Sequence, residues 1–245
     1  TTKRIEEFQY HTKEYVATIQ LGATTPSYDL EHEIDATYPT EHITRELVEK
    51  TLKTFVGEIQ QIPPAFSACK VDGKRAYDLA RKGEDVELKA KTLIIDEIEL
   101  LECNLPEIKI RVVCSKGTYI RTLCNDIGEK LGCGGAMEEL LRTRSGNFTL
   151  EESMTLSQVE EAVAGGNIGE KLVSIEDVLS MYPVLTCTPE GDRLLNNGNP
   201  LPEELVQGGS REERVRMYKS SGNFTGIYGW DERKQKYVPI RMFFV

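Results

Sequence analysis

The middle of the chain switches from one hydrophobic period to another, and this switch constrains the fold more than any other feature of the sequence. Residues 92–103 and 107–114 alternate apolar and polar side chains on either side of a turn, which predicts a β-hairpin. From Ile120 the apolar residues recur at helical spacing as far as Gly132, a residue type that often ends helices. A hairpin that leads into a helix through residues 115–118 indicates a sheet covered by helices.

Other segments follow the same two periods. Residues 13–22 alternate as a half-buried strand, and residues 44–57 form an amphipathic pattern that predicts a helix ending at Gly57. Residues 62–70 contain two prolines and are expected to be extended. A short helix is predicted over residues 74–83.

The last third of the chain has a different organisation. Thr155 and Ser174 each precede a short helical pattern, and three short strands follow Pro183. The three predicted strands are 213–219, 224–230 and 237–244. We therefore expect two domains, residues 1–182 and a small β-rich domain over residues 183–245. The predicted class is α+β, with a mixed, largely antiparallel sheet flanked by helices.

Charge and composition limit the classes of function that the chain can have. The 245 residues carry a net charge of -10, which argues against a nonspecific nucleic-acid coat protein. Residues 151–205 carry -9, residues 70–145 are neutral and residues 206–245 carry +4. The last two segments are either faces that bind a polyanion or ordinary solvated surfaces. No signal peptide or apolar run long enough to span a membrane is present in the sequence, so we expect a cytoplasmic protein with no membrane partner.

The sequence contains little that indicates metal or redox chemistry. The six cysteines form no CxxC pair and only three histidines are present, so we expect reduced thiols and no metal site. Phosphate-binding loops and dinucleotide fingerprints are also absent from the sequence, and we expect no cofactor.

The string from Cys114 to Gly128 carries the most chemical information. Gly117 allows a tight turn at the end of a strand, and Tyr119 and Arg121 follow at the start of the helix. An arginine held in this way can pair with a carboxylate or a phosphate. The alternative is that both side chains only pack or lie at the surface.

The chain resembles the bacterial tRNA pseudouridine synthase B (TruB) family over almost its whole length. The matching blocks are KEYVATIQLG with TTPSYD, IPPAFSACKVDGKRAYDLARKG, SKGTYIRTLCNDIGEKLG and LLRTRSGNF, with LLNNGNPL in a tail like a PUA-type RNA-binding domain. The resemblance implies isomerisation of uridine 55 in the tRNA T-loop. It also implies contacts with the T-loop and stem, with no cofactor and no obligatory protein partner.

The resemblance assigns roles to individual residues. Tyr15 matches the tyrosine that stacks on the flipped base, and Arg121 matches the arginine that pairs with the catalytic aspartate. Tyr119 lies in the same wall of the pocket. Leu140 matches an apolar residue that confines the base, although it could equally be a core leucine.

Three more residues match positions near the RNA. Asp29 corresponds to an acidic position near the site, and Lys70 corresponds to a basic one, although a surface lysine beside an extended loop would look similar. Arg142 follows Leu140 in the block LLRTRSGNF and is expected to contact RNA.

One departure from the family is large. The motif GTLDPxATG supplies the nucleophilic aspartate of the family, and no GxxDxxAxG string occurs in this chain. We therefore expect Arg121 to have lost its carboxylate partner, the chain to lack the first strands of the sheet, and residues 1–245 to be catalytically inactive. The alternative function is a noncatalytic protein that binds or folds tRNA.

Overall fold

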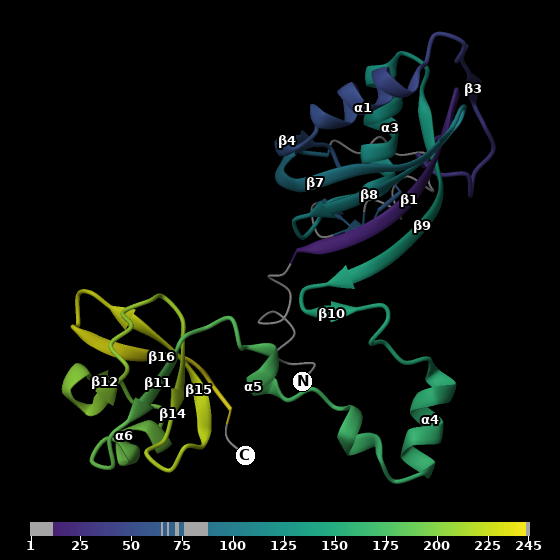
Figure 1. Ribbon diagram of the computed structural model, residues 1–245. Helices are drawn as coiled ribbons and strands as arrows, with labels where there is room; N and C mark the ends of the chain where they lie inside the picture. The colour runs from purple at the N-terminus through teal and green to yellow at the C-terminus, as the bar shows by residue number, and fades with distance from the viewer. Residues whose placement is uncertain (1–11, 65, 68, 72–73, 76–87, 244–245) are drawn as a thin grey trace. The chain divides into compact units, whose positions relative to one another are not determined.

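The computed structural model describes residues 12–64, 66–67, 69–71, 74–75 and 88–243 (Figure 1). Two compact units make up the chain, Thr1–Met154 and Thr155–Val245. The division lies before residue 182, where the sequence predicts the first domain to end. The assignment of an RNA-binding domain to residues 183–245 stays a prediction.

A six-stranded sheet forms the framework of the first unit, in the order β10-β9-β1-β8-β7-β4. Its strands are β1 (Lys13–Leu21), β4 (Gly57–Gln61), β7 (Lys91–Asn104), β8 (Glu107–Cys114), β9 (Gly135–Ser145) and β10 (Phe148–Thr149). Every neighbouring pair in this sheet is antiparallel. The predicted hairpin is confirmed, because β7 and β8 pair down to Asn104 opposite Glu107.

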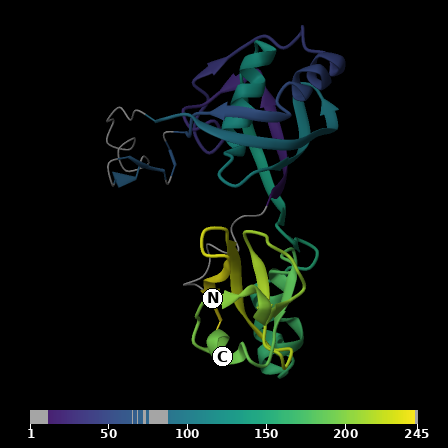
Figure 2. The ribbon, with the colours of Figure 1, turned by 90° about the vertical axis from the view of Figure 1, so that its left-hand side faces the viewer.

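Strand β1 lies in the middle of this sheet and places alternate side chains in the core. Tyr15, Ala17, Ile19 and Leu21 are all buried, as the alternation predicts. Helices α1 (Arg45–Lys53) and α3 (Ile120–Leu131) contribute buried side chains to the same core. The two helices therefore cover the face of the sheet to which Tyr15 belongs (Figure 2).

The helix boundaries follow from their caps. Helix α3 ends at Gly132, whose φ of 76° is left-handed, so the predicted stop is confirmed. Helix α1 starts after Thr44, whose hydroxyl accepts from the N–H of Leu47, but it ends at Lys53. The prediction that it continues to Gly57 is wrong, because Gly57 already pairs with Ile95 as the first residue of β4.

Two short strand pairs form separate two-stranded sheets outside the main sheet. They pair β2 (Ala23–Thr24) with β3 (Ala36–Thr37) and β5 (Lys70–Val71) with β6 (Lys74–Arg75). The helix predicted over residues 74–83 is wrong at Lys74 and Arg75, whose backbone pairs with β5. The rest of that prediction falls on residues outside the described part.

The second unit contains a separate sheet in the order β12-β16-β15-β14-β11-β13. Its strands are β11 (Val184–Cys187), β12 (Leu201–Pro202), β13 (Val206–Gln207), β14 (Val215–Tyr218), β15 (Phe224–Asp231) and β16 (Lys236–Met242). Strands β11 and β14 are parallel and the other pairs are antiparallel. The α+β class with mixed, largely antiparallel sheets is confirmed, as are the three predicted strands.

Short helices accompany this sheet. They are α4 (Leu156–Ala164), η2 (Ile168–Lys171), α5 (Ile175–Val178), α6 (Asp192–Asn196) and η3 (Glu203–Leu205). Thr155 and Gln158 form the predicted capping box of α4, and Ser174 caps α5. None of the helices in the described part of the chain has the length and apolar character that a membrane crossing requires.

Candidate active site

The pairing of β1 with β9 brings three of the predicted site residues to one face of the sheet. Tyr15 lies opposite Arg142, and Ala17 lies opposite Leu140. Directly opposed residues of antiparallel strands point to the same face, so Leu140 and Arg142 share the face of Tyr15. The guanidinium of Arg142 lies 5.3 Å from the centroid of the Tyr15 ring, within the range of a cation–π contact.

These three side chains differ in burial. Tyr15 is 7% exposed, whereas Leu140 is 44% exposed and Arg142 also lies open to solvent. The alternative of a core leucine at position 140 is therefore wrong. The face offers a buried aromatic ring beside an exposed apolar side chain and a movable cation.

A bulge in β9 sets this arrangement. Glu14 pairs with Arg144 while Tyr15 pairs with Arg142, so Thr143 is the additional residue. The hydroxyl of Thr143 donates to Glu14 Oε1 at 2.8 Å, and Glu14 Oε2 is 3.0 Å from Arg111 Nη1. Without the extra residue, the side-chain alternation of β9 would turn Arg142 to the opposite face.

Arg121 pairs with Asp29, which corrects the expectation that it has lost its carboxylate partner. Arg121 Nη1 lies 2.9 Å from Asp29 Oδ2, and Asp29 is only 5% exposed. Ser27 Oγ donates to the other oxygen, Asp29 Oδ1, at 2.5 Å. Both carboxylate oxygens are thus bound, as a buried charge requires.

Asp29 reaches Arg121 because its loop is attached to β9. The N–H of Leu30 donates to Met137 O, and the N–H of Met137 donates to Tyr28 O, both at 2.9 Å. Tyr28 has a φ of 67°, a left-handed conformation that is strained for a tyrosine and recurs at functional sites. Leu140 follows Met137 on the same strand, roughly 10 Å further along, so the ion pair and the Tyr15 face both adjoin β9.

Arg121 makes a second contact with the proline-containing segment, residues 62–70. Its Nη2 donates to the carbonyl oxygen of Phe66. Five residues earlier, Gln61 Nε2 donates to Tyr119 O at 3.1 Å, and the N–H of Tyr119 donates to Gln61 Oε1 at 2.9 Å. Tyr119 precedes α3 and has no side-chain cap of its own, so Gln61 fixes the start of the helix that carries Arg121.

His32 lies beside this group. Its ring centroid is 5.2 Å from that of Phe66, and its Nδ1 is 4.0 Å from Asp29 Oδ1. Sequence reasoning missed both Gln61 and His32. Gln61 is separated from Pro63 and Pro64 only by Ile62, and these prolines, which have no N–H to donate, were the signal that could have identified it.

The other predicted residues are placed less fully. Lys70 pairs with Arg75 through the backbone of β5 and β6, and its side chain lies outside the described part of the chain. Tyr119 is half-buried at the start of α3. Among the described residues, no group of three or more histidine, cysteine, aspartate or glutamate side chains is placed to hold a metal ion.

Comparison with known families places the chain beside RNA-modifying enzymes. Residues 1–120 match the N-terminal domain of the TruB family pseudouridylate synthases, and residues 121–180 match the C-terminal domain of tRNA pseudouridylate synthase B. The two family domains follow each other along the chain and together cover residues 1–180.

Curated relatives of the chain are named tRNA pseudouridine synthase B. The tRNA pseudouridine synthase B of Bacteroides fragilis is 81% identical over 160 residues, which cover 65% of this chain and 69% of that protein. The Phocaeicola vulgatus protein of the same name is 77% identical over 160 residues, covering 65% of this chain and 68% of that protein. The Ruegeria protein is 42% identical over 200 residues, covering 81% of this chain and 66% of that protein.

Solved structures share the fold. A Cbf5-Nop10-Gar1 complex matches with a TM-score of 0.71 and 21% identity, over 100% of this chain and 69% of that chain. An H/ACA ribonucleoprotein bound to a substrate RNA containing 2′-deoxyuridine matches with a TM-score of 0.69 and 20% identity, again over 100% and 69%. At this identity the likeness concerns the fold alone.

Proposed function

Because the chain belongs to the TruB family of tRNA pseudouridine synthases, we propose that it serves the isomerisation of uridine 55 in the T-loop of tRNA. That reaction breaks the C1′–N1 bond, turns the uracil ring and joins C1′ to C5. The base lies in a folded loop and must first be flipped into a pocket, at a cost on the order of a few kcal/mol. Contacts of the protein with the T-loop and stem offset this cost.

In this proposal the flipped uracil stacks on Tyr15. The ring belongs to a sheet face that Leu140 borders, and Leu140 confines the base from the side. Arg142 now covers the ring at 5.3 Å and would move to a flanking phosphate as the base enters. Tyr15 then lies close enough to C5 to take part in removal of its proton.

Arg121 orients the carboxylate that attacks the uridine. Its guanidinium has five N–H donors, and Asp29 and Phe66 occupy one nitrogen each. A second carboxylate can therefore bind the remaining donors, and a nearby cation favours the ionised, nucleophilic form. Asp29 holds Arg121 in place, and Tyr119 and Lys70 line the approach of the RNA.

The nucleophile itself is not among these residues. The sequence contains no GxxDxxAxG string, and the carboxylate of Asp29 is buried against Arg121 and Ser27. We therefore propose that residues 1–245 bind tRNA without converting it. A cytoplasmic location, the absence of a cofactor and the absence of an obligatory protein partner stay predictions.

The contact of Arg142 with Tyr15, beside the Arg121–Asp29 ion pair, carries this proposal. The test is to mix the chain with an unmodified tRNA transcript, measure affinity at several salt concentrations, footprint the RNA backbone and map pseudouridine. We expect salt-dependent binding, protection of the T-loop around position 55 and no pseudouridine.

Matched variants give the residue-level test. Tyr15→Ala and Arg142→Ala should each weaken binding about tenfold and remove the T-loop protection, whereas Tyr15→Phe keeps the ring and should bind like wild type. Arg45→Ala serves as control, because Arg45 pairs with Glu49 on the exposed side of α1. Protection elsewhere in the tRNA contradicts the assignment of position 55. Formation of pseudouridine contradicts the proposal that the nucleophile is absent.

A further inference from the structure

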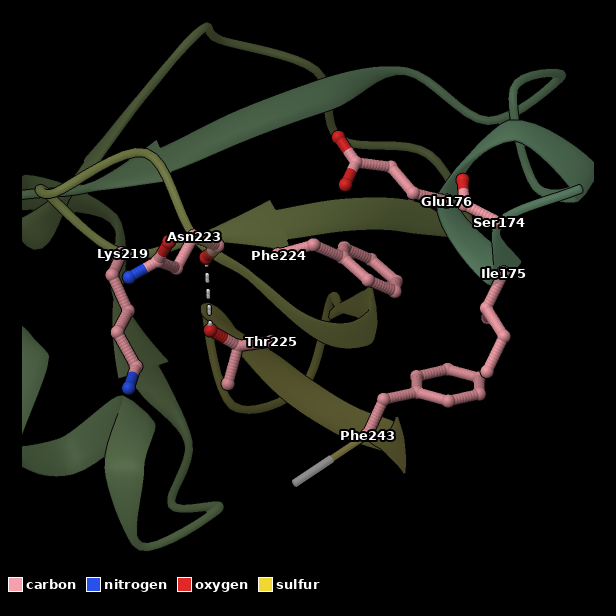
Figure 3. Close-up of a pocket in the computed structure, with 8 residues that line it drawn as sticks. All are labelled: Ser174, Ile175, Glu176, Lys219, Asn223, Phe224, Thr225 and Phe243. Carbon is pink, nitrogen blue, oxygen red and sulfur yellow. Dashed lines mark hydrogen bonds between the residues drawn. The ribbon is translucent and has the colours of Figure 1, made fainter. Parts of the chain in front are cut away.

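The second unit contains a cavity of about 620 Å³ between α5, the turn that joins β14 to β15, and the end of β16. Ser174, Ile175, Glu176, Lys219, Asn223, Phe224, Thr225 and Phe243 line it (Figure 3). Its size lies within the range of about 300–1,000 Å³ that is typical of small-molecule sites. None of the residues predicted from the sequence as site residues belongs to it.

One side of the cavity is aromatic and apolar. The rings of Phe224 and Phe243 have centroids 5.4 Å apart with an interplanar angle of 33°, and Ile175 lies next to Phe243 (Figure 3). Phe224 also contacts the ring of Tyr218 at 5.5 Å, which limits its movement. Such a wall suits a flat ring, because bases stack on aromatic side chains in a sequence-tolerant way.

The other side presents polar groups. Lys219 and Asn223 lie at the turn, and Lys219 is half-buried with no ion-pair partner for its ammonium among the described residues. Lys219 lies on the side of the pocket away from Phe243 (Figure 3), where its ammonium can pair with an anionic group attached to a stacked ring, such as a phosphate.

Glu176 adds an acceptor with a fixed orientation. The hydroxyl of Tyr218 donates to Glu176 Oε1 at 2.5 Å, and Oε2 has no hydrogen-bond partner among the described residues. Burial, followed by this bond, raises the pKa of Tyr218 to about 12, so the phenol remains a donor at neutral pH. The second oxygen of Glu176 is therefore left to accept a bond from a ligand N–H.

We propose that this cavity binds one unpaired nucleotide of an RNA, whose base has an exocyclic amino group. The base lies against Phe224 and Phe243, its amino group donates to Glu176 Oε2, and its phosphate contacts Lys219. The choice of RNA over a free nucleotide rests on the proposed function, since an enzyme that acts on tRNA meets unpaired nucleotides on its substrate.

The test uses the full chain and two single-stranded pentaribonucleotides, oligocytidine and oligouridine. Cytosine has an amino group at position 4 and an acceptor at N3, whereas uracil has a carbonyl group at position 4 and a single N–H at N3 that lies between two carbonyl oxygens, which a carboxylate repels. We expect oligocytidine to shift the NMR signals of the Phe224 and Phe243 rings and to bind about fivefold more tightly than oligouridine. Glu176→Gln should abolish this preference, because the amide can still accept from Tyr218 but replaces the free oxygen with a donor.

Lys219→Ala should weaken both oligonucleotides about tenfold and lower the salt dependence of binding, since one phosphate contact is lost. Lys236→Ala is the control, because Lys236 is an exposed lysine in the same unit but does not line the cavity. The inference is overturned if the ring signals do not move, if Lys219→Ala behaves like the control, or if cytidine monophosphate binds as tightly as the pentamer. The T-loop footprint of the Tyr15 variants is independent of this pocket, so the two proposals can fail separately.

Discussion

Gln61 and Tyr119 exchange two hydrogen bonds, in which the amide of Gln61 binds both the N–H and the carbonyl oxygen of Tyr119. Gln61 is 1% exposed at the end of β4, so water does not replace these bonds. The contact ties the proline-containing segment to the first turn of α3. Because Arg121 lies two residues after Tyr119, the position of its guanidinium depends on this contact.

The variant Gln61→Leu should therefore loosen Arg121 as well as destabilise the fold. Loss of both bonds leaves the N–H of Tyr119 unpaired, whereas its carbonyl oxygen still accepts from the N–H of Leu123, so the cost is about 1–3 kcal/mol of unfolding free energy. Urea unfolding measures that loss, and the Nε–H resonance of Arg121 should broaden or exchange faster. Gln61→Glu keeps the acceptor for the Tyr119 N–H and should restore part of both effects.

Gln60→Leu is the matched control for this prediction. Gln60 is the preceding residue on β4, and its amide donates to Thr92 on the exposed side. Its loss should change stability by less than about 0.5 kcal/mol and leave the Arg121 resonance unchanged. An unaltered Arg121 signal in Gln61→Leu would show that Gln61 has only a structural role.

The variant Asp29→Asn should directly weaken the ion pair that holds the guanidinium of Arg121 in place. The amide can still accept from Ser27, but it brings an N–H group toward the guanidinium and removes a nearly buried negative charge. Because Arg121 retains contact with solvent, we expect a loss of about 2–3 kcal/mol, at the lower end for broken buried pairs. Affinity for tRNA should fall along with stability.

Asp35→Asn serves for comparison, since Asp35 accepts from Thr24 at an exposed position in the neighbouring segment. It should change the unfolding free energy by less than about 1 kcal/mol. Equal unfolding free energies for the two variants would argue against a special role of the Arg121–Asp29 pair.

The hairpin β7–β8 and helix α3 could be predicted because their signals are local. Alternation over residues 92–114 and the stop at Gly132 do not depend on distant parts of the chain. Strand β9 could not be predicted in this way. Its middle residues, including Glu138 and Glu139, are exposed, and its two bulges break the alternation that identifies a strand.

The contacts within the site also could not be predicted from local sequence signals. The resemblance to known sequences selected Tyr15, Asp29 and Arg121, but it did not reveal which of them touch. The pairing of Asp29 with Arg121 joins residues 92 positions apart and depends on the attachment of the Asp29 loop to β9. Contacts of this kind follow from the tertiary fold, so the sequence alone led to the wrong expectation of an unpartnered arginine.

The variant Thr143→Val tests whether the β9 bulge positions Arg142. The hydrogen bond from Thr143 is the largest of several causes that lower the pKa of Glu14. A carboxylate with a lowered pKa stabilises the fold above the pKa of the unfolded chain, and this contribution disappears as the pH falls through the folded value. Thr143→Val should cost about 1 kcal/mol at pH 7 and much less near pH 3.

Binding is the second measurement for this variant. If the bulge slips, Arg142 leaves the Tyr15 face, and the affinity for tRNA should fall as it does in Arg142→Ala. Thr149→Val is the control, because Thr149 makes a similar bond to Glu152 at an exposed position. Unchanged tRNA binding by Thr143→Val would mean that the main-chain pairing holds the register without this hydroxyl.

The variant Asp126→Asn should stabilise the protein at neutral pH. Burial, followed by the charge of Glu129, raises the pKa of Asp126 from 3.8 to about 6. The folded state therefore binds the proton more tightly, so stability falls as the pH rises from about 4 to 6 and the penalty stays constant above that range. After allowance for partial solvent exposure, we expect Asp126→Asn to gain about 1–2 kcal/mol at pH 7–8 and nothing near pH 4.

Urea unfolding at several pH values measures this difference, and a carboxyl NMR titration gives the midpoint of Asp126 directly. Glu129→Gln should lower that midpoint, because it removes the neighbouring negative charge while its carbonyl can still accept from Asn125. A midpoint near 4 in the wild type, or equal stabilities of wild type and Asp126→Asn at pH 7, would mean that water reaches this carboxylate freely. The dependence on Glu129 separates the effect of charge from that of burial, since burial alone would leave the midpoint unchanged in Glu129→Gln.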